Sequence, residues 1–80
     1  MKRIAVLLIA AFAQAADLSE EGLKALEAKQ YDRAAQIFAK ALEADPKDYA
    51  AAFHLALANS LLGNDAEAIA GYKTVLDLKP

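Results

Sequence analysis

Few side chains in this sequence are of the types used in catalysis or metal binding, and they do not stand in the combinations that such sites need. His54 is the single histidine, and there is no cysteine. A zinc site needs several ligands of these types, and a nucleophile needs a base beside it. His54 has no such companion, so we predict a surface histidine. Ser60 has no base near it in the sequence, and no glycine-rich phosphate loop is present.

The carboxylates are explained by the helices that they are expected to begin. Four aspartates stand at predicted helix starts, where a carboxylate accepts an unpaired backbone N–H: Asp17, Asp32, Asp48 and Asp65. Glu20 and Glu21 follow in a first turn, close to the positive end of the helix dipole. The sequence therefore predicts no enzymatic activity, no cofactor and no metal ion.

Size and charge exclude further classes of function. The chain has 80 residues, so it forms one small domain with a modest core and no large cleft for a small-molecule substrate. Nine basic and eleven acidic side chains give a formal net charge of −2, and apart from Lys2 and Arg3 the basic ones are scattered singly. Nucleic acid is not an expected partner, because phosphate binding needs a concentrated positive surface.

The first residues have the order of a secretory signal peptide. Lys2 and Arg3 precede an uncharged apolar run of ten residues from Ile4 to Ala13, which is too short for the roughly 20 residues of a membrane-spanning helix. The small-x-small tripeptide 13–15 predicts cleavage after Ala15. An uncleaved membrane anchor and an ordinary buried helix are the alternatives.

Cleavage would make the remaining module, residues 16–80, more acidic. It would remove Lys2 and Arg3 and so move the formal net charge from −2 to −4. We expect an exported, periplasmic protein of a bacterium, or, if the signal is retained, one held at the inner membrane. The membrane is then a partner only through the signal peptide.

The remaining chain predicts four helices joined by short turns. The first runs from about residue 18 to 29, and the second has Asp32 as its N-cap and ends near Ala44, before Pro46. The third extends from Tyr49 to about Leu62 and is terminated by a left-handed Gly63. Asn64 and Asp65 begin the fourth. Such short connections make neighbouring helices antiparallel.

Apolar and small side chains recur at a period of 34 residues. Ala34, Phe38, Leu42 and Pro46 correspond to Ala68, Tyr72, Leu76 and Pro80. A period of this length is typical of stacked helical units rather than one closed globule. Phe38 and Tyr72 are therefore expected in the core.

This pattern resembles the tetratricopeptide repeat, a helix-turn-helix unit with small residues, one aromatic residue and a closing proline at fixed places. The matching positions are Gly22, Ala34, Phe38, Ala41 and Pro46, then Ala56, Gly63, Ala68, Tyr72 and Pro80. The resemblance implies an all-α fold with two tandem units, about 15–46 and 49–80, as a right-handed α-solenoid fragment after a signal-peptide helix.

In tetratricopeptide arrays the first helix of each unit lines a concave groove that binds a protein or peptide. The resemblance places eight side chains there: Ser19, Leu23, Leu26, Glu27, Phe53, Leu57, Ser60 and Leu61. We expect a non-catalytic scaffold of the bacterial cell envelope that binds an apolar or amphipathic peptide. A carboxylate-gripping groove is disfavoured, because Phe53 and Leu57 stand where polar residues would be needed. Packing against a neighbouring unit is the alternative role of this apolar line.

The fourth helix is expected to leave one apolar side, around Ile69 and Leu76, without cover. Solenoids usually need about three units and a terminal cap. Two alternatives follow: the chain is a fragment of a longer array, or it is a structural module that self-associates through this side.

Overall fold

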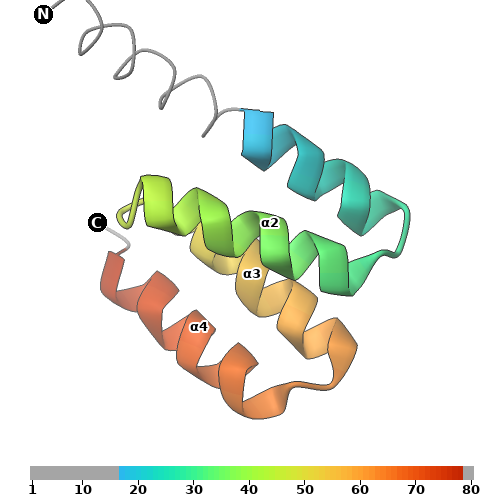
Figure 1. The fold of residues 1–80 in the computed structure, drawn as a ribbon. Helices are drawn as coiled ribbons and strands as arrows, with labels where there is room; N and C mark the ends of the chain where they lie inside the picture. Colours follow the sequence, from blue (N-terminus) through green and yellow to red (C-terminus); the bar gives the residue numbers. More distant parts are fainter. Residues whose placement is uncertain (1–16, 79–80) are drawn as a thin grey trace, which may run out of the picture.

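The computed structural model describes residues 17–78, and the regular structure in this part of the chain is helical (Figure 1). Residues 17–27 form a first helical segment, followed by α2 (Tyr31–Ala44), α3 (Tyr49–Leu62) and α4 (Asp65–Leu78). Consecutive helices lie side by side in chain order (Figure 1). The predicted all-α fold is therefore confirmed. The predicted signal peptide, residues 1–15, lies outside the described residues.

Helix α3 begins and ends as predicted. The Ala51 N–H donates a hydrogen bond of 3.1 Å to the carboxylate of Asp48, which is the N-cap. At the other end Gly63 has a φ of 82°, in the left-handed region that glycine adopts without steric cost. Both boundaries are set by residues adjacent in sequence, which is why sequence reasoning found them.

Three of the four predicted aspartate caps are wrong. Asp65 is the first residue of α4 itself rather than the residue before it. Helix α2 begins at Tyr31 with Gln30 as N-cap, and no side chain caps it. Asp32 lies inside the first turn, where its carboxylate accepts the N–H of Arg33 at 2.8 Å. Asp17 is already helical and so does not precede the first segment. The carboxylates of Asp32 and Asp65 still lie near the positive ends of their helices, where a negative charge is favourable.

The first helical segment ends at residue 27, two residues earlier than predicted. Lys29 has a φ of 62° and is the one non-glycine residue with positive φ among those described. The Lys29 N–H donates to the carbonyl of Leu26 at 3.0 Å, and the Gln30 N–H donates to that of Ala25 at 2.9 Å. These bonds pair the last carbonyls of the helix with donors, as in a Schellman turn.

The main core lies where the first segment, α2 and α3 meet. It is built largely from alanine around one large ring, which lets the helix backbones approach closely: Ala25, Ala34, Ile37, Phe38, Ala41, Ala51 and Ala58. Phe38 is 1% exposed, as predicted. His54 is half-buried and stacked on Phe38, so the prediction of a surface histidine is met only in part.

Helices α3 and α4 pack through small residues. A Cβ atom on Gly71 would lie 2.8 Å from the Cβ of Ala56, so the two backbones are in close contact there. Ala68 is buried, but Tyr72 is only half-buried, and its ring lies 5.9 Å from that of Phe53. The prediction of a core position is thus met fully by Phe38 and partly by Tyr72. None of the helices within residues 17–78 is long and apolar enough to cross a membrane.

Candidate functional site

The polar side chains of the described region do not cluster into a candidate metal-binding site. Within residues 17–78 no three His, Asp or Glu side chains gather in a way that could hold a metal ion. The imidazole of His54 is packed between two rings, stacked on Phe38 at 5.1 Å and edge-on to Phe53 at 5.6 Å. It therefore serves as a flat packing group between α2 and α3.

Helix α3 has three apolar sides, of which two are used inside the molecule. It has no Asp, Glu, Lys or Arg between Tyr49 and Leu62. One side, with Leu55, packs against the main core, and another packs through Ala56 against α4. The third side is in contact with water: Tyr49 is 51% exposed, Phe53 42% and Leu61 49%. A surface helix normally has a charged outer side, and this one does not.

Four of the eight predicted groove residues lie on α3, and they belong to this third side. Phe53, Ser60 and Leu61 are exposed, and Leu57 is half-buried. Because the four recur at helical spacing, they form one line along the helix. Phe53 also contacts Tyr72, so the line continues onto α4.

The other four predicted groove residues lie on the first helical segment. Leu23 and Glu27 are exposed, whereas Ser19 and Leu26 are half-buried. Leu26 packs against the same core as Leu55 of α3, so the two helices that carry the predicted set share one core. Leu26 therefore contributes to stability as well as to this surface.

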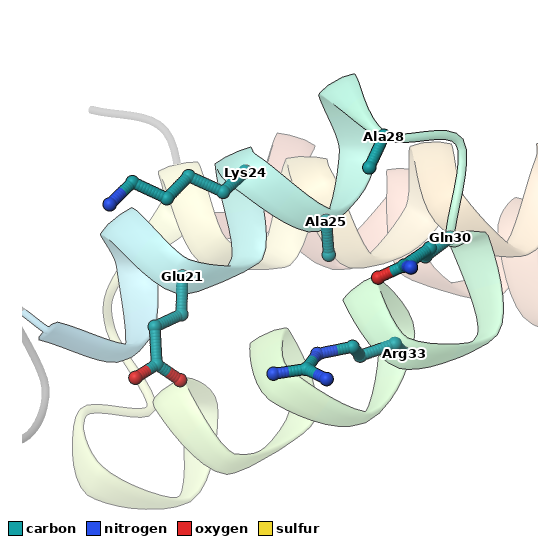
Figure 2. A pocket seen from close by; sticks show the side chains of 6 residues that line it. All are labelled: Glu21, Lys24, Ala25, Ala28, Gln30 and Arg33. Atoms are coloured by element: carbon teal, nitrogen blue, oxygen red, sulfur yellow. The ribbon is translucent and has the colours of Figure 1, made fainter.

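A depression that the sequence did not predict lies on the other side of the first segment, next to α2. It encloses about 400 Å³ and is lined by Glu21, Lys24, Ala25, Ala28, Gln30 and Arg33. Figure 2 shows the carboxylate of Glu21 and the guanidinium of Arg33 extending into the same space from the two helices. The lining side chains other than Ala25 are exposed, so water reaches these charges.

The charged depression and the apolar line belong to different sides of the molecule. Glu21 and Leu23 are two positions apart on one helix, and residues at that spacing point in nearly opposite directions. No sequence signal could have found the depression, because Glu21 and Arg33 line the same space only through the packing of two helices. The depression is therefore a water-exposed part of the surface with charges of both signs.

The family model described as "Tetratricopeptide repeat" matches residues 25–80, which is more than half of the chain. Neither the curated proteins nor the solved structures gave a significant match. Members of the matching family are in general non-catalytic modules of protein–protein interaction.

Proposed function

The chain belongs to the tetratricopeptide repeat family, and we propose that it is a non-catalytic scaffold that binds a partner protein along its predicted groove. The observation that carries this proposal is the outer side of α3. A helix without a charged residue exposes Tyr49, Phe53 and Leu61 to water. Exposed apolar side chains that gather on one side are typical of a protein-binding surface.

The composition of the groove residues defines the class of ligand. Of the eight, Glu27 alone carries a charge, and five are leucine or phenylalanine. An amphipathic helix with apolar residues at positions i, i+3, i+4 and i+7 fits such a surface. A lysine or arginine at the edge of that helix would pair with Glu27. The ligand is therefore a helical segment with one apolar side and a basic flank.

We place the working protein in the bacterial periplasm, after removal of residues 1–15. This proposal is supported by Lys2 and Arg3, by the apolar run and by the small residues at 13 and 15. Mass spectrometry of the protein from its own cells should find Ala16 at the N-terminus. An intact Met1 would instead favour the inner-membrane anchor.

Affinity capture with paired variants tests the groove. A tagged chain with Leu23→Ser and Leu61→Ser should capture at least ten-fold less of a specifically bound partner than wild type. Both leucines are exposed and belong to the predicted set. The control is Ile69→Ser with Leu76→Ser, which removes exposed apolar area from α4 and should leave capture unchanged. Circular dichroism verifies that both remain helical. The same partner yield from the groove variant and from wild type would refute the proposal.

A further inference from the structure

Four aromatic rings from α2, α3 and α4 lie in one continuous row. Phe38 of α2 is stacked on His54 of α3 at 5.1 Å, and His54 meets Phe53 edge-on at 5.6 Å. Phe53 in turn lies 5.9 Å from Tyr72 of α4. We call these four residues the aromatic row. It begins in the core, where Phe38 is 1% exposed, and reaches water in the predicted groove, where Phe53 is 42% exposed.

The aromatic row holds the ring of Phe53 from two sides. His54 is the next residue in α3, and adjacent helical residues point about 100° apart. The imidazole therefore faces the core and the phenyl ring faces the groove, while their edges stay in contact. Tyr72 approaches from α4 with an angle of 60° between the ring planes. Because both neighbours are half-buried, the fold fixes them, and the ring of Phe53 is oriented before a ligand arrives.

The other exposed apolar side chains on this side of α3 lie outside the aromatic row. Tyr49 is 51% exposed and Leu61 is 49% exposed. An exposed side chain loses rotamer freedom when a ligand covers it, and this loss subtracts from the affinity. Phe53 has lost much of that freedom in the fold already. A contact made by its rigid ring therefore contributes more to binding than a contact made by a similarly exposed leucine.

The first helical segment has no counterpart of this arrangement. A shift of 34 residues relates Phe53 to Ser19 and His54 to Glu20. Ser19 is half-buried, and the carboxylate of the exposed Glu20 lies 3.8 Å from the ammonium group of Lys24. A hydroxyl group and a solvated ion pair offer little apolar area. The rigid aromatic contact therefore belongs to the second repeat alone.

We propose that Phe53 is the residue on which the affinity of the groove depends most, and that His54 and Tyr72 are positioning residues that hold its ring. This inference rests on the proposed function, because it takes the ligand to be the amphipathic helix described above. One large apolar side chain of that helix packs against the exposed part of the Phe53 ring. His54 acts through Phe53, because its own ring lies between Phe53 and the core ring of Phe38.

A labelled amphipathic helical peptide serves as the probe, with leucine at positions i, i+3, i+4 and i+7 and with lysine and alanine elsewhere. Fluorescence anisotropy should show saturable binding to the full chain. Phe53→Ala should weaken binding about ten-fold and Leu61→Ala less than about three-fold, because the leucine is similarly exposed but is not held by neighbouring rings. Ile69→Ser with Leu76→Ser removes exposed apolar area from α4 and should bind the probe as wild type does.

The positioning role of His54 has its own test. His54→Ala should weaken binding several-fold, and His54→Phe, which keeps a flat ring in the aromatic row, should restore most of it. In the Phe53→Ala chain, His54→Ala should have no further effect, since the ring that it positions is gone. A readout without ligand is the nuclear Overhauser effect between the rings of Phe53 and Tyr72, which should be present in wild type and lost in His54→Ala.

The outcomes separate this inference from the proposed function. Equal losses from Phe53→Ala and Leu61→Ala would overturn the inference and leave the groove in place. An effect of His54→Ala that persists undiminished in the Phe53→Ala chain would overturn the positioning role, because the histidine would then act on the fold as a whole. If the wild-type chain does not bind the probe, the proposed class of ligand fails, and the inference fails with it.

Discussion

The ring of Phe38 lies so close to Gly22 that a Cβ atom on the glycine would be 2.5 Å from the ring Cζ. The other side of the ring is stacked on His54, with 5.1 Å between the ring centroids. Because the ring is enclosed by both neighbours, it cannot move away from an added methyl group. The packing of the first helical segment on α2 therefore depends on glycine at this position.

We predict that Gly22→Ala destabilises the protein. Alanine gains up to about 1 kcal/mol of helix propensity over glycine. Overpacking of a filled core costs roughly 1–3 kcal/mol, so the net loss should be about 1 kcal/mol in urea denaturation followed by circular dichroism. Phe38→Leu in the same chain should make the cost of Gly22→Ala smaller, since the ring is then gone. A variant more stable than wild type would contradict this reading.

Gly71→Ala should destabilise the pairing of α3 with α4. The new Cβ would lie 2.8 Å from the Cβ of Ala56 and 3.3 Å from its Cα, a backbone atom that cannot rotate away. We expect a loss of about 1–2 kcal/mol by the same overpacking argument. The matched test is Ala56→Gly with Gly71→Ala, which should recover part of the loss in thermal melts. No recovery would show that the contact is not the cause.

Lys29 and Gly63 offer a reciprocal experiment, because they occupy the same turn in the two repeats, 34 residues apart. Both have positive φ, 62° and 82°. Lys29→Gly should stabilise the protein by up to about 1 kcal/mol, and Gly63→Lys should destabilise it by a similar amount. Chemical denaturation of the two variants measures both signs. Equal stabilities would show that the left-handed turns carry no side-chain penalty.

Asp48→Ala should cost about 1 kcal/mol, the usual value for loss of an N-cap. The Ala51 N–H loses its 3.1 Å partner in this variant. Asp32→Ala is the control, since Asp32 lies inside its helix and its carboxylate accepts only the N–H of the adjacent Arg33. Its change in unfolding free energy should be clearly smaller. If the two variants are equally destabilised, general charge effects rather than capping explain the loss.

Sequence reasoning was most reliable where the cause is local. The cap at Asp48 and the left-handed Gly63 gave both ends of α3, and the end of α2 before Pro46 was also found. It failed at the first turn of α2 and at Lys29, because several aspartates are equally plausible caps and a lysine gives no signal of positive φ. The eight groove residues stay a prediction for the capture experiment to test.

The order of the helices and the 34-residue correspondence follow from the amino acids alone, because periodic small and apolar residues admit no other regular structure. How deeply each side chain is buried does not follow from the amino acids alone. Phe38 and Tyr72 hold the same place in the two repeats, yet one is enclosed and the other half-open, since α3 covers α2 and no described helix covers the outer side of α4. Burial depends on a neighbour that is distant in sequence, so the packed chain alone distinguishes an internal contact from a surface that is free to bind.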